Sequence, residues 1–145
     1  ETAFQAPPPK KPGLDELIAY LEAQYIPMVV ASSSRMASIL RHLNNWNMTN
    51  HFKALISGEQ FTSSKPDPEI FLTAAKALGT VPAETLVLED SYNGVRAGAR
   101  GGFVTVMVPD LAPADDEMRS LYTAECKDLR EVKKMLEEGK LLSEA

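Results

Sequence analysis

The sequence predicts an α/β fold with a doubly wound parallel sheet, and two observations carry that expectation. Short runs that are apolar throughout recur along the chain, as expected for strands covered on both faces. Amphipathic helical patterns separate these runs, and strands that alternate with helices indicate βαβ units. A length of 145 residues suits one domain that can bury a core.

The chain opens with a proline-rich stretch, residues 1–12, which excludes a helix or a central strand and predicts a linker. The alternative is a proline motif that a partner domain binds. The α/β core is expected over residues 13–139 and a tail over 140–145. The first expected elements are a helix near Leu14–Gln24, a strand over Met28–Ala31, a helix over Arg35–Asn45 and a strand over Ala54–Ser57.

The second half follows the same alternation. Pro68–Leu78 predicts a helix, because proline stands at its start and Gly79 follows its end. The remaining expected elements are a strand over Leu86–Glu89, a helix over Ser91–Arg100, a strand over Phe103–Val108, a loop from Pro109 to Asp116 and a helix over Lys127–Glu138.

Two glycines mark the helix expected over Ser91–Arg100. Gly94 and Gly98 are four residues apart and therefore lie on one helix face. Each costs about 1 kcal/mol relative to alanine inside a helix, so the pair indicates close packing against a strand.

Composition excludes several classes of function. A net charge of −5 provides no basic surface for nucleic acid. No apolar stretch approaches the length of a membrane span, and no signal-peptide pattern is present. The single Cys126 excludes an intrachain disulfide and agrees with a reducing compartment. We therefore expect a cytoplasmic protein that binds neither nucleic acid nor membrane.

The segment Glu89-Asp90-Ser91 places two adjacent carboxylates at the carboxyl end of an apolar strand. In an open α/β sheet, ligands bind at that end. Two neighbouring carboxylates repel each other unless a cation lies between them, and Mg²⁺ prefers such oxygen ligands. The alternative is a solvated helix start, with Asp90 or Ser91 as the N-cap.

Two further segments carry groups suited to an anion. Ser32, Ser33 and Ser34 follow an apolar run and precede a helical pattern, so their hydroxyls and backbone N–H groups can form an anion site. Lys65 precedes a rigid proline-rich stretch and a helix, and lysine serves phosphate as a compact charge. The alternatives are a helix cap for the serines and a solvated lysine.

The order of these segments resembles the haloacid dehalogenase superfamily of phosphohydrolases, in the branch of β-phosphoglucomutase-like and phosphoglycolate-phosphatase-like enzymes. Ser32 matches the second motif of that family, Lys65 the third, and Glu89-Asp90 the fourth; the resemblance runs from about Lys11 to Val108. It implies a Rossmann-like core and a small phosphorylated metabolite, such as a sugar phosphate, as substrate. It further implies that Ser32 and the backbone N–H of Ser33 bind the phosphoryl group, that Lys65 neutralises charge, and that Asp90 and Glu89 hold Mg²⁺.

The chain departs from the family at its first motif, Asp-x-Asp, which supplies the nucleophile that forms an aspartyl-phosphate. No Asp-x-Asp occurs in this sequence. We expect this chain to be the C-terminal part of a larger enzyme and to be inactive alone. It would lack the first strand and the helical cap of that enzyme. Its partner would be the missing N-terminal segment. The activity could be that of a phosphatase or of a phosphosugar mutase, and a module that binds phosphate or a partner without catalysis is the alternative of another class.

In the family, the strand of the first motif lies between the strand that ends in Ser32 and the strand that ends in Glu89-Asp90. Without it, both strands would expose backbone groups, which cost about 1–3 kcal/mol each when buried and unpaired. Three arrangements would avoid this cost. Another polypeptide could supply the strand, a segment such as Thr2–Gln5 could fill the gap, or the two flanking strands could pair directly. We favour the first.

Overall fold

A computed structural model describes residues 11–109 and 113–142 of the chain. Residues 1–10 of the expected linker, which include the segment Thr2–Gln5, and residues 143–145 of the expected tail lie outside these ranges. Within the described residues, no helix combines the length and the apolar character that crossing a membrane requires.

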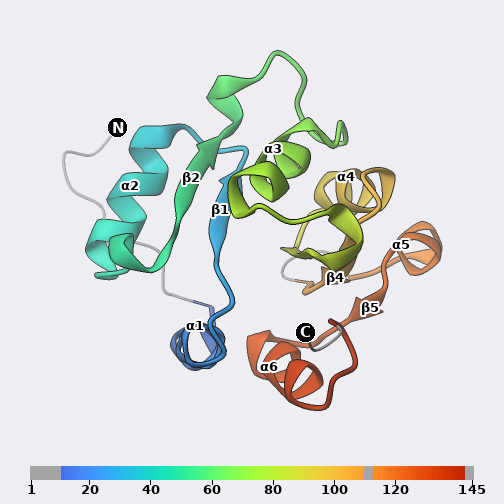
Figure 1. The fold of residues 1–145 in the computed structure, drawn as a ribbon. Coiled ribbons are helices and arrows are strands. Elements are labelled where there is room, and N and C mark those ends of the chain that lie inside the picture. Colours follow the sequence, from blue (N-terminus) through green and yellow to red (C-terminus); the bar gives the residue numbers. More distant parts are fainter. Residues whose placement is uncertain (1–10, 110–112, 143–145) are drawn as a thin grey trace.

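Helices and strands alternate along the chain, as the sequence predicts (Figure 1). The helices are α1 (Leu14–Ala23), α2 (Met36–Asn45), α3 (Glu69–Leu78), α4 (Tyr92–Arg100), α5 (Asp116–Leu121) and α6 (Leu129–Glu137). The strands are β1 (Val29–Ser32), β2 (Ala54–Ser57), β3 (Leu86–Glu89), β4 (Val104–Met107) and β5 (Ala124–Glu125). Three short 3-10 helices, η1 (Thr49–His51), η2 (Gly58–Gln60) and η3 (Pro82–Glu84), join them.

Every strand pair is parallel, which confirms the α/β class. In the described residues, however, the strands form two sheets, β1-β2 and β3-β4-β5. Ser32 at the end of β1 pairs with Ser57 of β2, and Glu89 at the end of β3 pairs with Met107 of β4. The direct pairing of the strands that end in Ser32 and Glu89, one of the three arrangements considered, is therefore not what the chain adopts.

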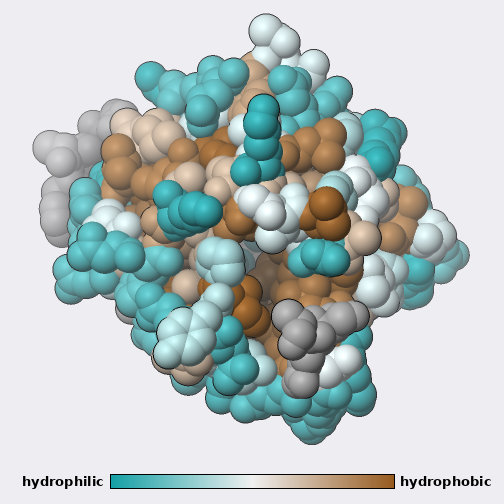
Figure 2. Space-filling view, in the orientation of Figure 1, coloured by the Kyte–Doolittle hydropathy of each residue, from teal (hydrophilic) through white to brown (hydrophobic). Residues whose placement is uncertain are grey.

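An apolar groove of about 280 Å³ lies between β1 and β3. Residues of both strands line it, among them Val29 and Ala31 from β1 and Val87 from β3. Figure 2 shows hydrophobic side chains around a hollow near the middle of this face. Among residues 11–109 and 113–142, no strand pairs with the facing edges of β1 and β3, and both edges border one apolar space.

Helices hold the two sheets together. Helix α3 packs on β1 and β2, α4 packs on β4, and α1 packs against α6. Phe71 of α3 meets Phe103, which precedes β4, edge to face at a centroid distance of 6.0 Å. This packing brings the carboxyl ends of β1 and β3 to the same side of the molecule.

The region after residue 115 differs from the expected loop and single helix. Asp115 caps α5 by accepting a hydrogen bond from the backbone N–H of Met118 at 2.8 Å. Strand β5 has two residues, and Ala124 pairs with Val106 of β4. Elements this short show too little periodicity in the sequence to be recognised. Their position depends instead on packing against α4 and β4.

Candidate active site

A cleft of about 700 Å³ opens at the carboxyl ends of β1 and β3. Its polar lining includes all the residues that the sequence singled out for an anion or a cation. These are Ser32, Ser33, Ser34, Lys65, Glu89 and Asp90, joined by Lys11, Ser91, Lys127 and Asp128. Ser32 and Asp90, which are 58 positions apart in the sequence, therefore share one space.

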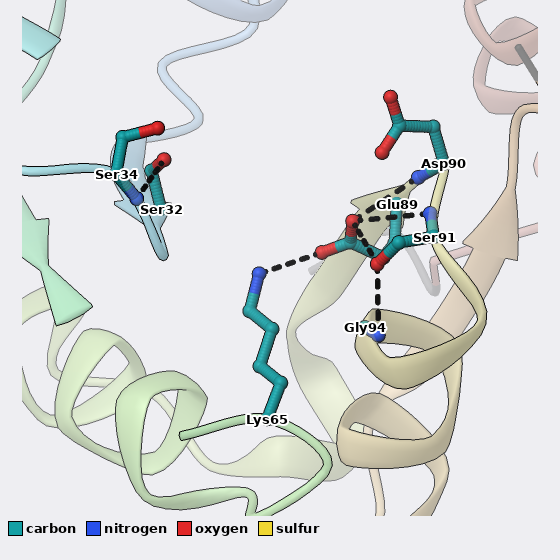
Figure 3. A network of polar contacts seen from close by, with 7 residues as sticks. All are labelled: Ser32, Ser34, Lys65, Glu89, Asp90, Ser91 and Gly94. Carbon is teal, nitrogen blue, oxygen red and sulfur yellow. Dashed lines mark hydrogen bonds and ion pairs between the residues drawn. The ribbon is translucent and has the colours of Figure 1, made fainter. Parts of the chain in front are cut away.

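The loop of Ser32, Ser33 and Ser34, called the serine loop from here on, forms one wall of the cleft. The backbone N–H of Ser34 donates to the Ser32 hydroxyl at 3.1 Å, which closes a tight turn after β1 (Figure 3). Helix α2 begins directly afterwards, and its N-cap residue Arg35 makes no side-chain capping bond. The loop thus presents hydroxyls to the cleft without using them to cap the helix.

Lys65 enters the cleft from the segment before α3, and its amine points into the space between Ser32 and Glu89 (Figure 3). Asp67 fixes that segment by accepting a hydrogen bond from the backbone N–H of Glu69 at 2.9 Å. The Lys65 side chain is 9% exposed, and its ammonium lies 4.7 Å from the centroid of the Phe71 ring. Lys65 is therefore a cation whose side chain is largely buried, and the alternative of a solvated lysine is wrong.

Glu89 is the direct partner of Lys65. Its Oε2 accepts from the lysine Nζ at 2.8 Å, and the Glu89 side chain is 11% exposed. Its Oε1 accepts from the Ser91 hydroxyl at 3.1 Å and from the Ser91 N–H at 3.3 Å. Gly94 makes room for this carboxylate, because a Cβ there would lie 2.0 Å from Glu89 Cδ. Glu89 is thus turned toward Lys65 and Ser91.

Asp90 faces the cleft, with its side chain 48% exposed. Ser91, not Asp90, caps α4, by accepting from the Gly94 N–H at 3.0 Å. Partial burial and then the nearby negative charge of Glu89 raise the pKa of the Asp90 carboxyl, while Lys11, whose Nζ is 3.8 Å from Asp90 Oδ2, lowers it. Asp90 is therefore a carboxylate whose negative charge is offset only in part by the Lys11 ammonium.

These two carboxylates fit a magnesium ion that relies on its substrate for further ligands. In residues 11–109 and 113–142, no group of three or more His, Cys, Asp or Glu side chains could hold a metal. Mg²⁺ is commonly bound by one or two carboxylates together with phosphate oxygens. Asp90 suits direct coordination, and Glu89, already bonded to Lys65, suits contact through water.

Several known proteins resemble this chain in sequence. Residues 5–108 match the family model described as haloacid dehalogenase-like hydrolase. The chain belongs to this family. Hexitol phosphatase B of Escherichia coli is 32% identical over an alignment of 131 residues, which covers 83% of this chain and 58% of that protein. The beta-phosphoglucomutase of Bacillus subtilis is 38% identical over 98 residues, which are 67% of this chain and 42% of that protein.

Solved structures show the same fold. The beta-phosphoglucomutase structure from Clostridium difficile superposes with a TM-score of 0.77 at 23% identity, and the match covers 90% of this chain and 56% of that one. The curated relatives above are longer than the region they share with this chain, which spans about half of their length.

Two residues that support the serine loop, Ser57 and Glu59, are not among those that the sequence motifs indicate. Ser57 is fully buried, and its hydroxyl donates to the Ser34 carbonyl at 2.6 Å. Glu59 accepts from the Met36 N–H at 2.7 Å. A signal was present, because Ser57 and Gln60 have the spacing of a capping box and form one.

Proposed function

We propose that the chain carries the electrostatic part of the active site of a Mg²⁺-dependent phosphohydrolase, which acts on a small phosphorylated metabolite through an aspartyl-phosphate. The observation that carries the proposal is the convergence of Ser32, Lys65 and Asp90 on one cleft. Buried lysine, hydroxyl donors and a partly balanced carboxylate are the groups that phosphoryl transfer needs around the phosphorus.

Each residue has a distinct role in this proposal. Ser32 donates its hydroxyl, and Ser33 its backbone N–H, to oxygens of the phosphoryl group. Lys65 neutralises negative charge on the phosphoryl group and on the attacking carboxylate, while Glu89 holds the lysine amine in place at 2.8 Å. Asp90 holds Mg²⁺, which supplies further neutralisation of the phosphoryl oxygens when bound.

The covalent part of the site must come from outside the described residues. We infer that a strand bearing the aspartate nucleophile occupies the groove between β1 and β3. The apolar lining of that groove supports this inference, as do the facing edges of both strands, with which no strand of the described part of the chain pairs. Such a strand would end beside Lys65, because β1 and β3 both end at the cleft. The segment would belong to a longer form of this protein, and the helical cap that selects the substrate would belong to the same form.

A phosphosugar mutase is the second candidate, favoured by the 38% identity to a beta-phosphoglucomutase. It would use the same residues of this chain and return the phosphoryl group to another hydroxyl. A module that binds phosphate without catalysis is a further alternative, and the activity measurements below separate it from both enzymes.

The test is phosphate release from a panel of sugar phosphates with Mg²⁺, measured for this chain and for a longer natural polypeptide that contains it. We expect release from the longer polypeptide and none from the chain alone. In the active form, Lys65→Met should lower kcat/KM by about 10²–10³-fold, the scale of other oxyanion-stabilising donors. Lys76→Met, on the exposed face of α3, is the matched control and should leave kcat/KM unchanged.

Removing Lys65 also leaves Glu89 buried without its partner, which can destabilise the fold. The double variant Lys65→Met/Glu89→Gln removes both charges and should stay folded by circular dichroism while remaining inactive. A folded double variant that retains wild-type turnover would refute the role of Lys65. Isomerised sugar phosphate in place of free phosphate would identify the mutase, and absence of turnover in the longer polypeptide would favour the non-catalytic module.

A further inference from the structure

The turn that carries Ser32, Ser33 and Ser34 has little hydrogen bonding within itself to stabilise it. Its internal bond is the one from the Ser34 N–H to the Ser32 hydroxyl, at 3.1 Å between two exposed groups. The first N–H groups of a helix have no partner within the helix, and Arg35 at the N-cap of α2 offers no side-chain acceptor. A loop that must hold several donors toward one anion therefore needs fixing from elsewhere.

The last residue of β2 and the first two residues of η2 supply that fixing at three consecutive positions. The buried Ser57 hydroxyl donates to the Ser34 carbonyl at 2.6 Å. At Gly58 the two backbones approach so closely that a Cβ would lie 3.0 Å from the Ser33 carbonyl oxygen. Glu59 Oε1 accepts from the Met36 N–H at 2.7 Å. Each of these contacts joins residues more than 20 positions apart, so together they tie the serine loop to β2 and η2.

Glu59 differs from the other two because it brings a charge. Its Oε2 lies 3.5 Å from Arg35 Nε, so one carboxylate contacts the residue before α2 and the first residue of α2 together. A negative charge at a helix N-terminus is favourable. Arg35 offsets that charge, which reduces its repulsion of an anion bound on the other side of the loop.

We propose that Glu59 is a positioning residue of the phosphate-binding loop, holding Arg35 and Met36 so that Ser32 and Ser33 face the cleft. The proposal rests on the function proposed above, in which these serines bind the phosphoryl group. Ser57 acts with Glu59, and its own hydroxyl is held by the N–H of Glu59 at 3.2 Å.

The experiment uses the full chain, with inorganic phosphate as the probe and amide chemical shifts of the serine loop as the readout. Glu59→Ala removes both contacts, whereas Glu59→Gln keeps an acceptor for the Met36 N–H and loses the charge that Arg35 meets. Glu22→Ala is the matched control. Glu22 is a carboxylate with a 46% exposed side chain, against 48% for Glu59, and it makes a comparable long-range contact to His51 at 2.8 Å.

We expect Glu59→Ala to weaken phosphate binding by about five- to tenfold, the effect of losing a charge-assisted hydrogen bond that orders the loop. Amide hydrogen exchange at Met36 should accelerate at least as much, and Glu59→Gln should fall between wild type and Glu59→Ala in both measurements. Glu22→Ala should lower the midpoint of thermal unfolding to a similar extent and leave phosphate affinity unchanged, which separates positioning from general stability.

A fourth variant separates the inference from the proposed function. If Lys65→Met abolishes phosphate binding and Glu59→Ala binds as wild type does, the inference is wrong and the anion site stands. If Lys65→Met binds phosphate as wild type does, or wild type binds none, the anion site is wrong and the inference falls with it. Equal losses of phosphate affinity in Glu59→Ala and Glu22→Ala would also overturn the inference.

Discussion

Replacing Gly94 by alanine should break the contact between Glu89 and Lys65 without touching either residue. An added Cβ would lie 2.0 Å from Glu89 Cγ and Cδ and 2.3 Å from its Oε2. The atoms that clash are the middle and the end of a side chain held by Lys65 and by Ser91. Glu89 therefore has to leave its position, and Lys65, 9% exposed, loses its ion-pair partner.

The size of the effect follows from three contributions. Alanine in a helix interior stabilises by about 1 kcal/mol relative to glycine. Overpacking costs about 1–3 kcal/mol, and loss of one partner of a buried ion pair costs up to about 3–5 kcal/mol. Because the displaced Glu89 stays close to Lys65, only part of the last cost applies. We expect Gly94→Ala to lower the free energy of unfolding by about 2–4 kcal/mol, a large share of the about 5–15 kcal/mol typical of a domain.

Urea unfolding followed by circular dichroism measures this change. The control repeats the substitution in the background Lys65→Met/Glu89→Ala, which removes both charges and the atoms that clash with the new Cβ. There Gly94→Ala should stabilise, by up to about 1 kcal/mol, because only the helix preference remains. The same loss in both backgrounds would refute the idea that Gly94 exists to accommodate Glu89.

Two further predictions concern titratable groups. Because burial and Glu89 raise the pKa of the Asp90 carboxyl, its charged form is less favourable in the folded than in the unfolded state. Asp90→Asn should therefore raise the midpoint of thermal unfolding at pH 7. The gain should disappear near pH 3, below the value of about 3.9 for an unperturbed aspartate, where both states are protonated; a gain that persists there would contradict this origin. Cys126 is fully buried, and burial raises the pKa of its thiol to about 11, so a thiol reagent at pH 8 should modify it in urea and not in the folded chain. Rapid modification of the folded chain would contradict that burial.

Elements with a strong local pattern could be predicted from the sequence. Ala54–Ser57 and Leu86–Glu89 are strands with the expected bounds. The strand expected over Met28–Ala31 lies one residue further on, since hydrogen bonding to β2 includes Ser32. The expectation of close packing at the two glycines of α4 is confirmed, because a Cβ on Gly98 would lie 2.6 Å from Thr105 Oγ1.

Which residues line the candidate site could be predicted from the sequence, but which side chains contact each other could not. That Ser32, Lys65 and Asp90 follow strand ends or precede a helix can be read locally, and parallel strands bring such ends together. Which way the Glu89 carboxylate turns depends on the position of a lysine 24 residues away. The support of the serine loop by Glu59 depends likewise on a turn 23 residues away. Contacts of this kind are set by tertiary packing, which a single sequence does not reveal.

The division of the strands into β1-β2 and β3-β4-β5 also has a consequence for cooperativity. In the described residues, no backbone ladder crosses from one sheet to the other, so the two halves are coupled through helix packing such as the Phe71–Phe103 contact. Side-chain packing opens more easily than a central ladder, so we expect each half to exchange its amide protons as a separate foldon. A strand bound in the groove would hydrogen-bond to both edges and merge the two foldons. Assembly of the active site and completion of cooperative folding would then be one event.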